Sequence, residues 1–176
     1  GIARTEVFAG DYLDEPQITI ISPTRDFYES LLPKFRNKLN FHWALEALEE
    51  NSYSSKDDIS DETTLSKTLD DATDDTSAHN QSSIVFLLET DEKQKFLFTG
   101  DAGRDAFNHV PQTLLGKVKD VTWMKVPHHG SKHNLDSTII KHVNPEIAYI
   151  STEKQGKYLN RSTVFALKKN GTKVYS

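Results

Sequence analysis

The chain has 176 residues, 36% of them hydrophobic, a formal net charge of −5 and no cysteine. This length supports one domain with its own core, and the lack of cysteine excludes a disulfide framework and thiolate metal sites. Any transition metal would need histidine, aspartate or glutamate ligands. No stretch has the length of a membrane span and the N-terminus has no signal-peptide pattern, so we expect a cytoplasmic protein with no membrane contact by this segment.

A strand followed by helices is predicted near the start of the chain. Residues 17–22 (QITIIS) form a β-branched run, which is typical of a strand. Thr24 is placed to cap a helix that begins TRDFYESLL, and Pro33 is expected to end or kink that helix. Helical spacing resumes over 40–51. Residues 1–50 therefore form the first part of the folded domain.

Residues 51–82 differ in composition from the rest of the chain. They carry eight acidic residues and only two lysines, and serine, threonine and aspartate dominate. Such a segment buries too little apolar area to offset the entropy lost on ordering. We expect a disordered acidic insertion. The alternative is an acidic docking tail, which would make the protein an interaction adaptor.

The remaining residues, 83–176, alternate between predicted strands and helices. Strands are expected at 83–89, 95–101, 120–127, 146–151 and 173–176, and helices at 104–115, 134–143 and 161–171. The first two strands read as a hairpin, and Pro111 should disturb the first of these helices. This alternation is typical of a layered α/β architecture.

Two predicted strands end on side chains that can bind metal ions. FLFTGD ends on Asp101, and WMKVPHH ends on the pair His128–His129. In layered α/β proteins ligands gather at the carboxyl ends of strands, and carboxylates and imidazoles are ligands for zinc, manganese and iron. Gly100 and Gly130 would allow close backbone approach. The ordinary alternative is that Asp101 is a turn residue or helix cap and that the histidines lie in a solvated loop.

The segments SSIVFLLE, KFLFTGDAG and DVTWMKVPHHGSKHNLDSTIIKHVNPEIAYIS occur in that order. They resemble the C-terminal half of metallo-β-lactamase-fold hydrolases, in particular the branch of the ComEC/Rec2 DNA-uptake proteins and their free-standing relatives. The resemblance covers roughly residues 17–50 and 83–176. It implies an α/β (α+β) fold that forms the C-terminal half of an αββα sandwich, with a metal centre along one edge.

The resemblance also implies roles for individual residues. Asp101 matches the carboxylate that bridges two divalent ions, zinc or manganese, and either His128 or His129 would be a further metal ligand. Lys125 and Ser131 belong to the same motif and are the candidate catalytic residues near an anionic substrate, although Lys125 is also compatible with an outward-facing strand position. The candidate substrate-binding residues flank these motifs in the sequence: Asn80, Asn160 and Arg161. The Arg161 guanidinium suits a phosphate, but this residue is also compatible with an ordinary position on a helix surface.

The resemblance fails at the signature H-x-H-x-D-H, which this sequence lacks. Catalytic zinc sites use about three protein ligands per metal, so this chain alone is not expected to hold two ions or to be active. Half of a sandwich would also expose one face of its sheet. We therefore expect a fragment whose partner is the missing N-terminal half, from the same polypeptide or from another chain.

The residues at the two strand ends favour a metal-dependent hydrolase that uses a metal-activated water, and the resemblance implies phosphodiester bonds, with nucleic acid as the substrate. The alternative is a non-catalytic binding or scaffold module that keeps the fold without a complete metal site. The missing signature supports this alternative. So does Asn160, which stands where the resembling branch commonly has a histidine.

Overall fold

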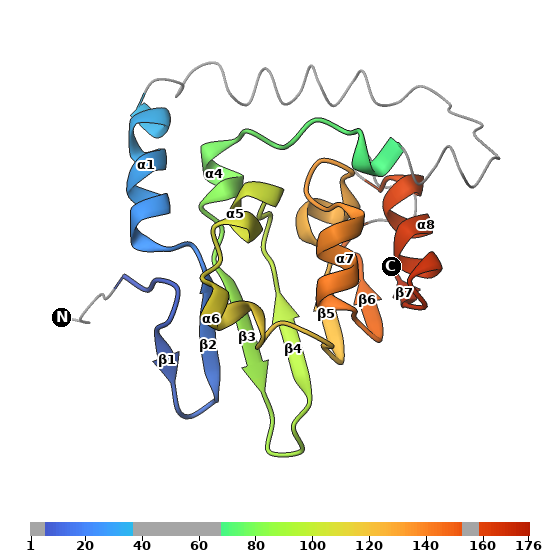
Figure 1. Cartoon of the computed structure of the whole chain (residues 1–176), viewed down its shortest axis with the longest axis horizontal. Helices are drawn as coiled ribbons and strands as arrows, with labels where there is room; N and C mark the ends of the chain where they lie inside the picture. Colours follow the sequence, from blue (N-terminus) through green and yellow to red (C-terminus); the bar gives the residue numbers. More distant parts are fainter. Residues whose placement is uncertain (1–5, 37–67, 153–158) are drawn as a thin grey trace.

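The computed structural model describes residues 6–36, 68–152 and 159–176 (Figure 1). The predicted helical segment 40–51 and the part of the acidic insertion from 51 to 67 lie outside these residues.

The described residues form one mixed sheet of seven strands, arranged in the order of the sequence. The strands are β1 (Tyr12–Leu13), β2 (Ile18–Ser22), β3 (Val85–Glu89), β4 (Lys95–Phe98), β5 (Trp123–Lys125), β6 (Ile147–Tyr149) and β7 (Lys173–Tyr175). Neighbouring strands are antiparallel from β1 to β4 and parallel from β4 to β7. The predicted mixed α/β class is confirmed.

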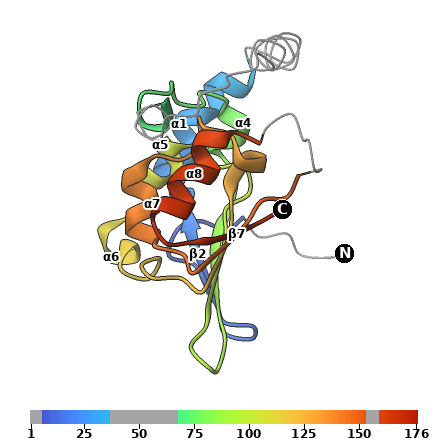
Figure 2. The same ribbon diagram turned by 90° about the vertical axis from the view of Figure 1, so that its right-hand side faces the viewer.

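Helices cover one face of this sheet (Figure 2). They are α1 (Arg25–Arg36), α4 (Ala78–Gln81), α5 (Arg104–Asn108), α6 (Gln112–Leu115), α7 (Ser137–Val143) and α8 (Arg161–Lys169), with a 3₁₀ turn, η1 (Pro127–Gly130), after β5. In the described part of the chain, no helix combines the length and apolar character needed to cross a bilayer.

Most predicted elements are present, and their ends follow from local chemistry. The Thr24 hydroxyl accepts a hydrogen bond from the Phe27 amide at 3.2 Å, which caps α1 as expected. Pro111 separates α5 from α6. Pro33, however, lies inside α1 and does not end it. It is exposed, so water can bind the carbonyl that the proline leaves without an intrahelical partner.

The covered face of the sheet carries the core. One register row crosses six strands there: Thr19, Leu87, Leu97, Met124, Ala148 and Val174. Leu87, Leu97, Met124 and Ala148 have no exposed surface. Their burial against the helices supplies the main stabilising term of the domain.

The opposite face is also apolar, but no described helix lies over it (Figure 2). The neighbouring register row reads Ile18, Leu88, Phe96, Trp123, Ile147 and Lys173. Side chains alternate between faces along each strand, so this row points away from the helices. The Phe98 ring lies 5.2 Å from the Trp123 ring, and the Phe86 and Phe98 rings stack at 4.6 Å. We call this surface the open sheet face.

Residues 68–82 differ from the expected disordered insertion. Leu69 is fully buried in the core, and Ser77 caps the short helix α4. Few apolar residues are needed because this segment is held largely by hydrogen bonds. One of them runs from the Asp75 amide to the His133 carbonyl at 3.1 Å. The average composition of residues 51–82 therefore does not reveal that residues 68–82 are ordered.

Candidate site at the β4–β5 edge

The ends of β4 and β5 bring Asp101 and His128 to the same edge of the sheet. The two strands are parallel, with Phe96 opposite Trp123, so their carboxyl ends coincide. Two hydrogen bonds join the segments beyond the strands. The Thr99 hydroxyl donates to the Lys125 carbonyl at 2.7 Å, and the His128 amide donates to the Gly100 carbonyl at 3.4 Å. The expected meeting of the two strand ends is therefore present, while the roles of these residues stay predictions.

Lys125 turns its ammonium group toward Asp101. Its Nζ lies 3.4 Å from Asp101 Oδ1 and also donates to the Gly100 carbonyl. The Asp101 side chain is 41% exposed and the Lys125 side chain 19% exposed, so water still reaches the carboxylate. The Asp101 amide donates to the Ser83 hydroxyl at 3.2 Å, which holds the turn that carries the carboxylate.

His128 lies against a carboxylate that the sequence analysis did not select, that of Asp75. His128 Nδ1 is 3.3 Å from Asp75 Oδ2. Two side-chain amides donate to the same oxygen, Asn80 Nδ2 at 2.8 Å and Asn134 Nδ2 at 3.0 Å. A carboxylate only accepts hydrogen bonds, so the contact with Asp75 favours a proton on Nδ1 of His128, the atom that also lies 3.4 Å from Asn80 Nδ2.

This arrangement shifts both pKa values. Burial raises the pKa of the Asp75 carboxyl, but hydrogen bonds from His128, Asn80, the Ser77 amide and Asn134 outweigh that effect and lower it to about 2. Burial lowers the pKa of His128, but the hydrogen bond and charge of Asp75, with the charge of Asp101, raise it above its ordinary value. Asp75 is therefore ionised at neutral pH, and protonation of His128 is favoured.

The histidine pair adopts an uncommon backbone conformation. His128 has φ 42° and His129 has φ 54°, both in the left-handed region. For L-residues other than glycine this region costs about 1–2 kcal/mol per residue. The following Gly130 has φ +86°, and a Cβ there would lie 3.1 Å from Ile150 Cγ2. Strained turns of this kind concentrate at functional sites.

The two histidines face different surroundings. The His129 Nδ1 contacts the Ser151 carbonyl beyond β6, whereas His128 contacts Asp75. Their ring centroids are 6.1 Å apart. Of the two imidazoles, His128 is the one that the structure places among the other charged groups of this edge.

Of the remaining predicted site residues, some lie next to Asp75 or the histidine turn and one does not. Asn80 joins the cluster through Asp75. The Ser131 hydroxyl accepts from the His133 amide at 3.2 Å, and the Asn160 side chain accepts from the Ser162 amide at 2.9 Å and so caps α8. Asn160 still touches the histidine turn through its backbone, since its amide donates to the Gly130 carbonyl at 3.2 Å. Arg161 begins α8 and is exposed.

The described residues do not fit a metal centre by themselves. Within residues 6–36, 68–152 and 159–176, no three or more histidine, aspartate or glutamate side chains converge as a metal site requires. Asp101 and His128 also face oppositely charged neighbours, Lys125 and Asp75. A tightly held ion would need further donors.

Asp75 and Asn134 are the site residues that sequence reasoning missed. Asp75 belongs to the acidic segment that we expected to be disordered, and Asn134 is the first residue of the predicted helix 134–143, whose N-cap in the structure is Asp136. The sequence signal near Asp75 is the aliphatic residue Leu69. In the structure Leu69 is fully buried and anchors the chain next to Asp75.

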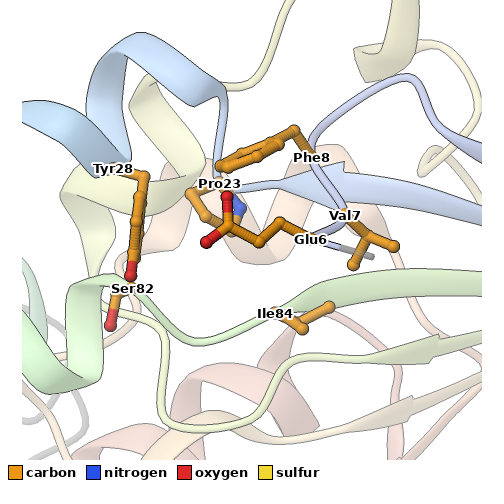
Figure 3. Close-up of a pocket in the computed structure, with 7 residues that line it drawn as sticks. All are labelled: Glu6, Val7, Phe8, Pro23, Tyr28, Ser82 and Ile84. Carbon is orange, nitrogen blue, oxygen red and sulfur yellow. The ribbon is translucent and has the colours of Figure 1, made fainter. Parts of the chain in front are cut away.

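A shallow hollow of about 230 Å³ lies to one side of this edge (Figure 3). It is lined by Glu6, Val7, Phe8, Pro23, Tyr28, Ser82 and Ile84. Its floor is largely apolar, with the Glu6 carboxylate and the hydroxyls of Tyr28 and Ser82 as polar groups. None of its lining residues is one of the charged residues of the β4–β5 edge.

The fold and site thus define a mixed α/β domain with a charged edge at the ends of two parallel strands. The chain is similar to ComE operon protein 3 of Bacillus subtilis (strain 168), with 32% identity over 84 residues. The match covers 48% of this chain and 10% of the relative, so it spans about a tenth of that protein. No protein-family model and no solved structure matches the chain. The relative supports a partial relationship to the ComEC-like branch, and no family model supports the metallo-β-lactamase fold.

Proposed function

We propose that this chain forms one edge of a metal-dependent hydrolase that acts on phosphodiester bonds, with nucleic acid as substrate, in a protein with a role related to DNA uptake. The observation that carries this proposal is the position of Asp101 and His128 at the adjacent ends of β4 and β5. The resemblance to the ComEC/Rec2-like branch and the similarity to ComE operon protein 3 support it.

The charges of the edge suit an anionic substrate. Lys125 places a cation at the end of β5, beside Asp101. A phosphodiester attracts such groups through charge-assisted hydrogen bonds. Ser131 belongs to the same turn and is a further candidate to bind the substrate, although its hydroxyl also holds the turn.

The metal part of the proposal requires donors beyond the described residues. We expect zinc or manganese, with two ions in the complete protein, and assign Asp101 and His128 to the share of ligands that this chain supplies. His128 is preferred over His129 because it faces the Asp75 and Asp101 carboxylates. The other ligands would come from the N-terminal half of the fold.

The same half would cover the open sheet face. That face presents a row of five apolar side chains and one lysine across six strands. Sheets with such faces pack against each other at about 10 Å, and a large uncovered apolar surface is unfavourable in water. We therefore assign the open sheet face to a second sheet, from the same polypeptide or from another chain.

The alternative function is a non-catalytic binding module. It is favoured by one observation: Asp101 and His128 each lie beside an oppositely charged side chain within this chain. An edge whose charges are matched in this way is stable without a metal. The two functions differ in one measurable property, which is the metal content of the complete protein.

The test uses the full-length protein and the variant Asp101→Asn, with Asp105→Asn, at an exposed position of α5, as the matched control. Zinc and manganese content is measured by elemental analysis, and hydrolysis is followed with bis(p-nitrophenyl) phosphate and single-stranded DNA. We expect Asp101→Asn to lower metal affinity and hydrolysis at least about tenfold, and the control to match the wild type. A metal-free wild type whose Asp101→Asn variant behaves identically would establish the binding module instead.

A further inference from the structure

Arg104 is a buried arginine that begins α5, just after Asp101 in the sequence. Its residue surface is only 6% exposed. A buried guanidinium is costly unless its donors are all satisfied. The contacts of Arg104 therefore show what the protein gains by burying it.

All five N–H groups of Arg104 have acceptors. Nε donates to the Leu135 carbonyl at 3.0 Å. Nη2 donates to the carbonyls of Leu69 at 2.7 Å and Lys132 at 3.0 Å. Nη1 donates to the Ala72 carbonyl at 3.0 Å and pairs with Asp74 Oδ1 at 3.0 Å. A guanidinium has five donors in a fixed fork, so this side chain is fully used.

These acceptors lie on two segments that are far apart in the sequence. One is residues 69–74, which leads directly to Asp75, and the other is residues 132–135, which contains Asn134. Neither segment belongs to the sheet, so strand pairing does not fix them. Arg104 joins the two through four backbone carbonyls.

Each of the two segments supplies a side chain to the surroundings of His128. Asp75 Oδ2 lies 3.3 Å from His128 Nδ1, and Asn134 Nδ2 donates to that same Asp75 oxygen at 3.0 Å. Asn134 Nδ2 also lies 3.1 Å from the Asp101 carbonyl. The relative position of the two segments therefore decides whether Asp75 and Asn134 meet next to His128.

We infer that Arg104 is a positioning residue for this site: by joining residues 69–74 to residues 132–135, it holds Asp75 against Nδ1 of His128. The functional meaning of this contact rests on the proposed role of His128. Arg104 touches neither His128 nor Asp101 through any of its five donors, so it acts only through the segments that it joins.

A purely structural arginine and a positioning arginine differ in a spectroscopic signature. In the full chain with ring-¹⁵N-labelled histidine, the ring shifts of His128 report which nitrogen carries the proton and are assigned with His128→Gln. Arg104→Lys keeps the charge but has too few donors, and too short a reach, to span both segments. We expect the His128 ring shifts to move toward those of a solvated imidazole, and the Asp75 amide to exchange its proton at least tenfold faster.

Two internal references make the result specific. His142 Nε2 lies 2.9 Å from the Leu115 carbonyl, away from the joined segments, so its ring shifts should not move. Arg25→Lys is the matched substitution, because Arg25 lies over the Phe8 ring at 4.1 Å and contacts neither segment. A folded Arg104→Lys chain with unchanged His128 ring shifts would overturn the inference.

A second variant decides the matter if Arg104→Lys does not fold. Asp74→Asn weakens one of the five contacts, and the Asp74 side chain is 45% exposed, so the core is not disturbed. We expect a smaller movement of the His128 shifts in the same direction, and none for Asp71→Asn, an exposed control in the same segment. No movement in Asp74→Asn rejects the inference. Neither readout uses metal or substrate, so failure of the proposed hydrolase leaves this result unaffected, and the reverse also holds.

Discussion

The Asp75 carboxylate lies 3.3 Å from Nδ1 of His128. Asp75 belongs to an acidic, polar segment, and His128 belongs to a distant turn at the end of β5. Asn80 and Asn134 complete the hydrogen bonding of the same carboxylate oxygen. This partly buried pair orients the His128 ring and connects three separate parts of the chain. It also makes the stability of the domain depend on pH.

The pH dependence follows from the directions of the two pKa shifts. The Asp75 pKa is lowered from 3.8 to about 2, so its contribution is present above pH ~4 and is lost as the pH falls toward 2. The His128 pKa is raised from 6.5, so its contribution is present below about 6.5 and is lost as the pH rises through the raised value. The pair should therefore stabilise the fold most between about pH 4 and 6.5, by about 2 kcal/mol.

Urea unfolding of the wild type and of Asp75→Asn across pH 2–9 tests this dependence. The variant should lose the acid-side and the alkaline-side slopes together, because one pair produces both. Asp71→Asn, at an exposed position, should keep both slopes. Parallel stability curves for the wild type and Asp75→Asn would show that the pair does not contribute.

The glycine after the histidine turn is predicted to be more sensitive than another glycine of the same conformation. Gly130 has φ +86° and a Cβ there would meet Ile150 Cγ2 at 3.1 Å, while Gly171 has φ +90° and open space around it. Alanine should cost about 1 kcal/mol at Gly171 through the backbone alone and about 2–3 kcal/mol at Gly130, where crowding adds. Thermal unfolding of both variants measures the two losses of stability. Equal losses would show that contact with Ile150 adds no cost at position 130.

A charge introduced on one face of β5 should destabilise the fold far more than a charge introduced on the other face. Met124 is fully buried under the helices, so Met124→Glu should cost more than about 4 kcal/mol or prevent folding. Trp123 lies on the open sheet face, so Trp123→Glu should change the unfolding free energy of this chain by only about 1 kcal/mol. Because we propose that a second sheet from an N-terminal half covers this face, Trp123→Glu should weaken association with that proposed half severalfold in a pull-down of the separately expressed halves. Unimpaired association would mean that another surface makes that contact.

The Asp101–Lys125 pair is predicted to add little to stability. Its atoms are 3.4 Å apart and the carboxylate is 41% exposed, so water screens the attraction. A double-mutant cycle with Asp101→Asn and Lys125→Gln should give a coupling energy of no more than about 1 kcal/mol. A much larger value would identify the pair as a structural element and weaken the case for Asp101 as a functional group.

Local sequence patterns predicted a large part of the fold. The β-branched and apolar runs located β2, β3, β4 and the later strands. Such runs are visible as local patterns along the chain, and so are the helical segments between them. The prolines and caps located several helix ends, Thr24 among them. The polar residues after FLFTG and after Val126 could be placed at one edge because parallel strands share the edge where they end.

The partners of those polar residues were decided only by the tertiary structure. Asp75 lies in a segment whose composition predicted disorder, and its burial depends on Leu69 in the core and on the five contacts of Arg104. No local pattern encodes such contacts, because they join residues 69–74 to residues 132–135 and form only once the helices have packed on the sheet. The sequence alone therefore determined which side chains reach the edge, and the packing of distant loops decided that His128 faces Asp75 while His129 faces Ser151.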